Sequence, residues 1–238
     1  MDTPTVAQPS EETLKLLNRD LEGKSPQEIL DYAFQQYFPK IILACSFGAE
    51  DVALADMMLR INPDAALFYL DTDFLFPETY DVRDRIIAKY GLKAHQVFQM
   101  KTVLTPDDQA KQYGEALWSR DPDQCCNLRK VEPLGRILKN YSAWVTGIRR
   151  DQSPTRAKAG FIEWDQTWQL VKVNPLAAWS AEEVWAYIYR HDVPYNSLHE
   201  KNYPSVGCTH CTAPVMPGDD PRSGRWKNFV KTECGLHR

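Results

Sequence analysis

The sequence contains no apolar run long enough to span a bilayer, so we expect neither a transmembrane segment nor a membrane partner. It begins Met-Asp-Thr-Pro, with neither a basic region nor an apolar run, and we therefore expect no secretory signal. The net charge is only −4 at pH 7, which gives no electrostatic argument for a nucleic-acid partner. Six cysteines among 238 residues suit metal binding or catalysis in a reducing cytoplasm better than a framework of disulfide bonds.

Short apolar segments alternate with segments of helical apolar spacing along most of the chain. The apolar segments predict five strands, at residues 41–45, 66–70, 94–98, 142–145 and 169–173. The helical spacing predicts helices at residues 11–18, 26–36, 77–89, 105–120, 131–140 and 180–191, and one that follows residues 46–51 and reaches Leu59. This alternation indicates an α/β protein with a parallel sheet, and such sheets bind ligands at the carboxyl ends of their strands. We interpret residues 1–238 as one domain with a loop-rich functional segment at 207–238.

Two prolines are expected to mark helix boundaries in the middle of the chain. Pro122, within Asp-Pro-Asp, is expected to break the chain before the cysteine pair that follows it. Pro133 is expected in the first turn of the helix at residues 131–140, where a missing N–H is tolerated.

A glycine turn, Ser46-Phe47-Gly48, lies between the first predicted strand and the next helix. Such a turn presents backbone N–H groups and a helix N-terminus to an anion, although an ordinary tight turn has the same local pattern. It is not a Walker A loop, because Gly-Lys-Ser/Thr is absent. Glu50 and Asp51 would repel a phosphate, so we expect them to point away from the ligand, or Asp51 to pair with a cation.

Three arginines follow the fourth predicted strand within eight residues: Arg149, Arg150 and Arg156. Guanidinium groups bind phosphate and sulfate through paired hydrogen bonds, so this loop is a candidate anion site. The alternative is a solvated surface loop.

Four of the six cysteines form two close pairs. Cys208 and Cys211 have the spacing that lets two thiolates reach one metal centre, and Cys125-Cys126 is the only other close pair. Together they indicate an all-cysteine zinc site or an iron–sulfur cluster, whereas Cys-x-x-Cys alone also suits a redox pair or a small zinc knuckle. Adjacent cysteines are unusual in disulfides and in zinc ribbons, which favours a cluster.

The remaining cysteines are Cys45, beside the glycine turn, and Cys234, near the end of the chain. Cys234 is next to Gly235 and close to His237, with arginines upstream. Positive charge stabilises a thiolate, so Cys234 is a candidate nucleophile, and the alternative is a spare exposed thiol.

Several motifs taken in order resemble those of the assimilatory sulfonucleotide reductases, relatives of the PP-loop nucleotide hydrolases. They are Ser-Phe-Gly-Ala-Glu-Asp, Leu-Asp-Thr-Asp with Pro-Glu-Thr-Tyr, Cys-Cys with a nearby lysine, Thr-Gly-x-Arg-Arg-Asp-Gln-Ser, Cys-x-x-Cys and Glu-Cys-Gly-Leu-His. The resemblance covers nearly the whole chain from about Ile41 and implies a doubly wound, mostly parallel α/β sheet that binds an adenine nucleotide. The cysteine pairs resemble the branch that mostly reduces adenosine 5′-phosphosulfate. The branch that prefers the 3′-phosphorylated substrate generally lacks them.

The resemblance also implies which residues bind the cofactor and the substrate and which residue is the nucleophile. A 4Fe-4S cluster would be bound by Cys125, Cys126, Cys208 and Cys211. The Cys234 thiolate would attack the sulfate sulfur and release AMP, and thioredoxin or a glutaredoxin-like donor would then release sulfite. Ser46 and Gly48 would hold the phosphosulfate, and the backbone of Leu70 and Gly147 would meet adenine. The residues expected on the anionic groups are Lys130, Arg156, Arg222, Arg225 and His237.

We further expect a cytoplasmic enzyme that forms a homo-oligomer. Since thioredoxin supplies the electrons, a cluster near Lys130 would shape the electric field at the sulfate instead. Many cluster-type members read Ser-Phe-Ser-Gly-Ala-Glu-Asp, one residue longer than the loop here, and the loop around Ser153 is also one residue short. The rival hypotheses are a PP-loop ligase or tRNA-thiolating enzyme that uses ATP, and a zinc-stapled module that binds a nucleotide without catalysis.

Overall fold

A six-stranded sheet forms the centre of the protein, with strand order β3-β2-β1-β4-β6-β5. The computed structural model describes residues 7–227, 229, 231 and 233–236. The strands are β1 (Ile41–Ala44), β2 (Leu67–Leu70), β3 (Val97–Met100), β4 (Ala143–Val145), β5 (Ile162–Asp165) and β6 (Leu170–Val173). Neighbouring strands are parallel except for β5, which pairs antiparallel with β6 at the edge.

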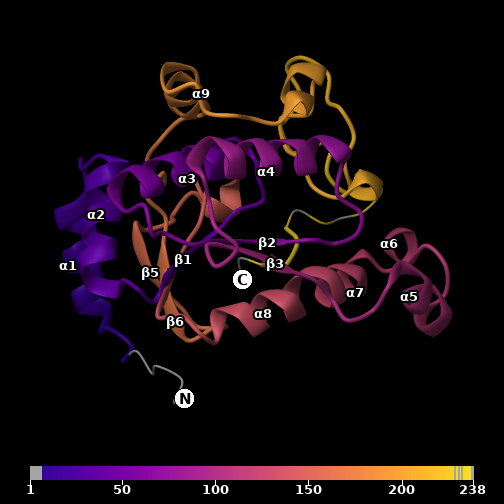
Figure 1. Ribbon diagram of the computed structural model, residues 1–238, viewed down its shortest axis with the longest axis horizontal. Helices are drawn as coiled ribbons and strands as arrows, with labels where there is room; N and C mark the ends of the chain where they lie inside the picture. Colours follow the sequence, from indigo (N-terminus) through magenta and orange to yellow (C-terminus); the bar gives the residue numbers. More distant parts are fainter. Residues whose placement is uncertain (1–6, 228, 230, 232, 237–238) are drawn as a thin grey trace.

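Helices cover both faces of the sheet (Figure 1). They are α1 (Glu11–Leu21), α2 (Pro26–Tyr37), α3 (Ala49–Ile61), α4 (Pro77–Tyr90), α5 (Pro106–Tyr113), α6 (Leu117–Arg120), α7 (Pro122–Cys126), α8 (Glu132–Leu138) and α9 (Ala181–Arg190). Successive residues of a strand point to opposite faces, and β1 shows the result. Leu43 belongs to the larger core with α2, α3 and α9, whereas Ile42 packs with Leu134 and Ile137 of α8. The predicted fold class, an α/β protein with a doubly wound sheet, is confirmed.

Four of the five predicted strands match closely, and the structure corrects the rest. β3 begins at Val97 rather than at residue 94, because the buried Gln96 side chain donates to the carbonyl oxygens of Pro63 and Ala65 and holds a turn there. β5 was not predicted. It is a short edge strand that forms a hairpin with β6, and the Glu163 carboxylate lies 3.5 Å from the Lys172 ammonium across the pair.

The predicted helix at residues 105–120 is two helices. Gly114, with φ +82°, ends α5, and the guanidinium of Arg120 donates to the carbonyl oxygen of Tyr113 at 2.6 Å across the break. The capped helix after Ser180 is confirmed as α9, with both hydrogen bonds of the Ser180–Glu183 capping box.

The helix breaks before the cysteine pair, as predicted: α6 ends at Arg120, and Cys125 and Cys126 lie in the new helix α7, which begins at Pro122. Asp121 caps α7 by accepting from the backbone N–H of Gln124, and Pro122 occupies its first turn. Pro133 lies in the first turn of α8, as predicted, and a π-helical turn, Asn127–Val131, joins α7 directly to this helix. Proline cannot donate to the carbonyl four residues earlier, and its ring crowds that carbonyl, so the wider turn is a physical response to Pro133.

No helix among the described residues is both long and apolar enough to cross a membrane. The strand order reverses between β1 and β4, since β2 and β3 extend to one side of β1 and β6 and β5 to the other side of β4. The loops at the carboxyl ends of β1 and β4 therefore separate, and ligands of such sheets bind at this point.

Candidate functional site

A cleft of about 620 Å³ opens at the carboxyl ends of β1, β2 and β4. This volume is within the range of small-molecule sites. Eight of the nine predicted substrate residues line it: Ser46, Gly48, Leu70, Lys130, Gly147, Arg156, Arg222 and Arg225. The ninth, His237, lies outside the described residues. The fold thus brings the predicted set together, while the role of each residue stays a prediction.

The turn before α3 presents a helix N-terminus to the cleft. Gly48 is the N-cap of this 13-residue helix and supplies no side-chain cap, which leaves the first backbone N–H groups available to an oxyanion. Phe47 adopts φ +61°, which is uncommon for a residue with a side chain, and its buried ring packs on Tyr69 with centroids 5.5 Å apart. Packing of Phe47 therefore fixes the backbone of the turn.

Two acidic residues at the start of α3 have different kinds of hydrogen-bond partner. Glu50 accepts from Arg149 Nε at 3.0 Å. Asp51, expected to turn away from the ligand or to pair with a cation, instead accepts from the backbone N and the Oγ of Ser46, both at 2.6 Å. Burial raises the pKa of Asp51 to about 6, against these two hydrogen bonds, which lower it.

Gly147 lies where the loop after β4 touches the start of α3. A Cβ atom at this position would lie 2.5 Å from Asp51 Oδ1 and 2.7 Å from Glu50 Cβ, closer than any real side chain allows. Only glycine lets the two loops approach this closely at the floor of the cleft.

Each of the three loop arginines meets a carboxylate. Arg149 pairs with Glu50 and Asp151, and Arg150 pairs with Glu22 at 3.3 Å. Arg156 pairs with Glu233 of the C-terminal segment at 2.7 Å. The loop is thus largely neutralised by the protein itself, in contrast to the open anion site that its composition predicts.

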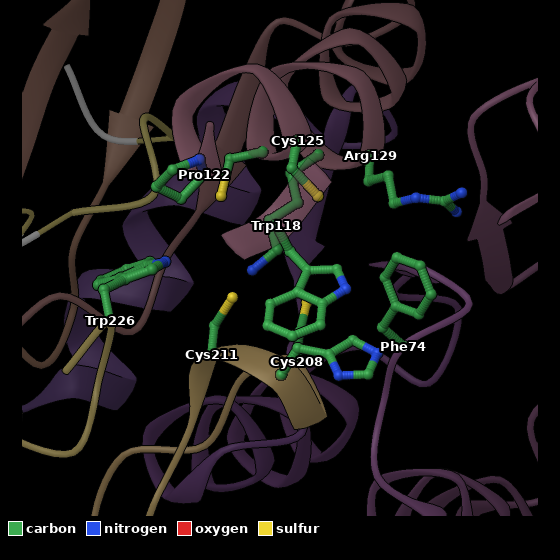
Figure 2. Close-up of a pocket in the computed structure, with 11 residues that line it drawn as sticks. Phe74, Trp118, Pro122, Cys125, Arg129, Cys208, Cys211 and Trp226 are labelled. Atoms are coloured by element: carbon green, nitrogen blue, oxygen red, sulfur yellow. The ribbon is translucent and has the colours of Figure 1, made fainter. Parts of the chain in front are cut away.

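Four cysteines from two distant segments line a second, adjoining pocket: Cys125, Cys126, Cys208 and Cys211. Figure 2 shows the sulfur atoms of Cys125, Cys208 and Cys211 directed into the same space. The turn at residues 208–211 is fixed to the loop after β2, because Thr209 N donates to the carbonyl oxygen of Phe74 at 2.8 Å. Thr72 Oγ1 lies 3.3 Å from Cys208 Sγ in the same contact.

Aromatic rings and a buried arginine surround the cysteine pocket (Figure 2). The ring of His210 stacks on Trp118 at 4.3 Å and meets the edge of Phe74 at 5.0 Å. Arg129, only 1% exposed, donates to Gln109, to the carbonyl oxygen of Thr72 and to Asp73, and its guanidinium carbon lies 4.5 Å from the centroid of the Phe74 ring.

Two buried donors of this pocket, Arg129 Nη2 and Trp226 Nε1, find no hydrogen-bond partner among the described residues. Buried donors are rarely left unsatisfied, so they indicate an acceptor that belongs in the pocket. Nowhere in the described part of the chain do three or more His, Cys, Asp or Glu residues gather closely enough to hold one metal ion. Four thiols spread around one pocket, with two donors aimed at an acceptor, fit a larger sulfur-containing group better than a single zinc ion.

Burial raises the pKa of Cys125 to about 12 and that of Cys211 to about 11. Both thiols therefore need a bound cation to ionise near neutral pH. Lys130 and Trp226 line this pocket and the cleft alike, so they form a shared wall. Burial alone would lower the pKa of Lys130, but the neighbouring cysteines, Cys208 first, raise it above its usual value.

The predicted nucleophile, Cys234, lines the cleft together with Glu233 and Leu236 of the same segment. Cys45 also lines it but is only 2% exposed, and burial raises the pKa of its thiol well above the ordinary value. Of the two thiols, Cys234 is thus the more accessible to a substrate.

Sequence reasoning missed three residues that shape these sites: Thr72, Arg129 and Glu233. Thr72 and Glu233 belong to motifs that were recognised, Leu-Asp-Thr-Asp and Glu-Cys-Gly-Leu-His, and Arg129 lies three residues after the cysteine pair. Proximity to a motif was the available signal, but only the folded contacts assign a role.

Comparisons with known proteins agree with this arrangement. The family model of the phosphoadenosine phosphosulfate reductase domain matches residues 40–214. The adenosine 5′-phosphosulfate reductase of Shouchella clausii is 48% identical over 221 residues, covering 93% of this chain and 91% of that protein. The phosphoadenosine 5′-phosphosulfate reductase of Gloeobacter violaceus is 46% identical over 227 residues, covering 94% and 93%. The crystal structure of phosphoadenylyl-sulfate reductase from Candida auris, a phosphate complex, superposes with a TM-score of 0.76 at 32% identity, covering 88% of this chain and 99% of that one.

Proposed function

Since this chain belongs to the phosphoadenosine phosphosulfate reductase family, we propose that it reduces adenosine 5′-phosphosulfate to sulfite and AMP with thioredoxin as the electron donor. The observation that carries the proposal is the position of Cys234 on the wall of the cleft. Among the described residues that line the cleft, the only other thiol is that of Cys45, which is buried. The same cleft holds the uncapped N-terminus of α3, which suits the anionic half of the nucleotide.

Substrate binding uses the two ends of the cleft. Backbone groups of Leu70 and Gly147, at the ends of β2 and β4, meet adenine. Ser46, Gly48 and the α3 N-terminus hold the phosphosulfate. Lys130 and Arg225 add positive charge, and Arg225 is held in place because its Nη1 donates to Ser205 Oγ at 3.1 Å.

In the first step the Cys234 thiolate attacks the sulfate sulfur. A bond forms between the two sulfur atoms, and the bond from sulfur to the bridging phosphate oxygen breaks, so that AMP leaves with that electron pair. The product on the enzyme is a cysteine S-sulfonate. A thiolate is a strong nucleophile for this displacement, and nearby positive charge favours its formation.

In the second step a thioredoxin thiolate attacks the sulfur of Cys234. The bond between the two sulfur atoms of the S-sulfonate breaks, and sulfite leaves with its electron pair. The second thioredoxin thiol then resolves the mixed disulfide and restores the Cys234 thiolate. The substrate sulfur gains two electrons, and thioredoxin becomes a disulfide. Because such a donor is kept reduced in the cytoplasm, the proposal places the protein there.

The cysteine pocket would hold a 4Fe-4S cluster through Cys125, Cys126, Cys208 and Cys211. When bound, this group would supply fixed charge at the wall that the pocket shares with the cleft, beside Lys130. Arg129 and Trp226 would donate hydrogen bonds to its sulfur atoms.

The proposal favours the substrate without a 3′-phosphate. A 3′-phosphate needs a cationic partner, but Arg149, Arg150 and Arg156 each pair with a carboxylate in the protein. The similarity to relatives named for both substrates makes this choice the part of the proposal that an experiment must decide.

The test is sulfite release from both sulfonucleotides, with thioredoxin present. We expect a higher kcat/KM for adenosine 5′-phosphosulfate. A higher value for the 3′-phosphorylated compound would reverse the substrate assignment, and ATP–pyrophosphate exchange without sulfite release would indicate a ligase.

Mass spectrometry tests the intermediate. Without a reductant, the substrate is expected to add one sulfonate to the peptide that contains Cys234. Cys234→Ser is expected to abolish sulfite release, whereas Cys45→Ser, the matched control, keeps it. Sulfonate on Cys45 instead would show that the wrong thiol was chosen. Light scattering measures whether the protein is the homo-oligomer that we expect.

A further inference from the structure

We propose that Glu233 docks the C-terminal segment by binding Arg156 and Arg222, and that Arg156 is consequently a residue that positions Cys234 rather than one that binds substrate. Here the docking segment means residues 233–236. The inference rests on the proposed function only for the meaning of Cys234 as the nucleophile, because the contacts themselves do not depend on it.

The contact between Glu233 and Arg156 is two-pronged. Arg156 Nε donates to Glu233 Oε1 at 2.8 Å, and Arg156 Nη2 donates to Glu233 Oε2 at 2.7 Å. Arg222 Nη2 adds a third hydrogen bond to Oε2 at 3.3 Å. The side chains of Arg156 and Glu233 are only 12% and 20% exposed, so this pair is screened less than a surface ion pair and its planar geometry is well matched.

The pair is joined to the floor of the cleft. Arg156 Nη1 donates to Gln152 Oε1 at 2.5 Å, and Gln152 Nε2 donates to Glu50 at 3.0 Å and to the carbonyl oxygen of Gly147 at 3.2 Å. A continuous chain of hydrogen bonds therefore runs from Glu233 to the start of α3. Through these hydrogen bonds, the position of Glu233, the residue next to Cys234, is fixed relative to the same turn that presents the anion site.

An apolar contact holds the other side of Cys234. Leu236 packs against the smaller core cluster, which contains Trp144 and Leu134, and Gly235 takes φ +84° between the two anchors. Glycine adopts this conformation without strain, so the chain turns sharply after Cys234. Cys234 is thus flanked by a charged anchor and an apolar anchor, and both line the cleft.

The guanidinium group of Arg156 already binds other residues of the protein. Each of its three guanidinium nitrogens donates to a protein oxygen, and its fork is occupied by the Glu233 carboxylate. A substrate oxyanion can gain the same two-pronged contact only by displacing Glu233, which would release the segment that carries the nucleophile. A two-pronged substrate contact through Arg156 Nε and Nη2 and the docking of Cys234 by Glu233 therefore exclude each other.

The first test measures how fast a bulky maleimide labels Cys234 in the cluster-loaded protein, with the labelled peptide identified by mass spectrometry. Glu233→Gln and Arg156→Gln are each expected to raise the rate about tenfold, the size expected for losing charge-assisted hydrogen bonds, and the double variant is expected to add little. Arg156→Gln is the decisive variant. Removing a cation lowers the thiolate fraction, so electrostatics alone would slow labelling and only undocking would speed it. An unchanged or slower rate overturns the inference.

Two controls keep this test sharp. Glu22→Gln breaks the exposed ion pair of Arg150, at 3.3 Å, without touching the segment, and should leave the labelling rate unchanged. Arg222→Gln gives the same comparison if Arg156→Gln fails to fold, and it is expected to speed labelling by a smaller factor because its hydrogen bond to Glu233 is longer.

The second test separates docking from substrate binding. In a Cys234→Ser background, adding Arg156→Gln is expected to change the Kd for adenosine 5′-phosphosulfate by less than about twofold, whereas kcat of the Arg156→Gln enzyme falls about tenfold. A Kd weakened tenfold or more would make Arg156 a substrate ligand and overturn the inference. If the nucleotide does not bind Cys234→Ser at all, the proposed function fails, while the labelling result still judges the docking contact.

Discussion

Replacing Asp51 with asparagine is expected to stabilise the protein above pH 6 while leaving its stability near pH 4 almost unchanged. Burial raises the pKa of Asp51 from 3.8 to about 6, so the folded protein holds this proton more tightly than the unfolded chain does. The free energy of unfolding consequently falls as pH rises from about 4 to about 6 and stays at the lower value above that range. Asparagine has no such proton, and its oxygen keeps an acceptor for Ser46.

The expected change in the free energy of unfolding follows from the pKa shift of Asp51. A change of about two pKa units corresponds to about 3 kcal/mol, and partial exposure of Asp51 reduces this to about 2 kcal/mol. For a chain of this length, that is a rise in Tm of about 4–8 °C at pH 7.5. The groups that also act on Asp51 are Glu50 and Cys45, which are unchanged in the variant, and Arg156, whose attraction partly favours the charged form.

The assay is thermal unfolding of the purified wild type and Asp51→Asn, compared at several pH values from 4 to 8 without oxygen. Acid damage to a cluster affects both proteins, so the difference between their Tm values is the quantity that matters. We expect this difference to grow through pH 6. A difference that is constant with pH, or a variant that is less stable at pH 7.5, would refute the reasoning, because it would mean that the hydrogen bonds from Ser46 outweigh the cost of burial.

Three further changes test other parts of the site. Gly147→Ala is expected to cost about 1–3 kcal/mol in urea unfolding, since the added Cβ would lie 2.5 Å from Asp51, and an unchanged midpoint would contradict the close approach. Trp118→Ala removes the ring stacked on His210 at 4.3 Å and is expected to cost about 1 kcal/mol and to speed the loss of visible absorbance in air, which equal decay rates would rule out. Cys208→Ser is expected to lose the iron, acid-labile sulfide and brown colour predicted for the wild type, and a colourless, active wild-type protein that contains zinc would disprove the cluster.

Local chemistry made much of the fold predictable. Pro77 and Ser180 begin helices where their side chains suit a first turn and a cap, and the apolar run at Ile41 forms the strand that its composition indicates. The same reasoning failed where an element depends on the element that it packs or pairs with. β5 depends on pairing with β6, and the helical run through the cysteine pair depends on a π turn that accommodates Pro133.

The site shows the same division. Motifs identified the residues that line the cleft, because the carboxyl ends of parallel strands must meet at one edge. They did not reveal that Glu233 accepts hydrogen bonds from Arg156, which lies 77 positions earlier in the chain. Nor did they reveal that Arg129 is buried beside the cysteine pocket. Composition identified the charges of the arginine loop, but only the folded contacts show which carboxylate neutralises each one.

The cysteine pocket is assembled from the loop after β2, the helix α7 and the turn at residues 208–211. Cys125 and Cys126 therefore leave the ribosome well before Cys208 and Cys211 are translated, and during that interval two thiols of the set have no partners. The cluster proposed for this pocket could be bound by all four cysteines only after Cys211 has been translated. Its insertion would then close a loop between two distant segments of the chain, which would couple cofactor delivery to the folding of the segment that carries Cys208 and Cys211.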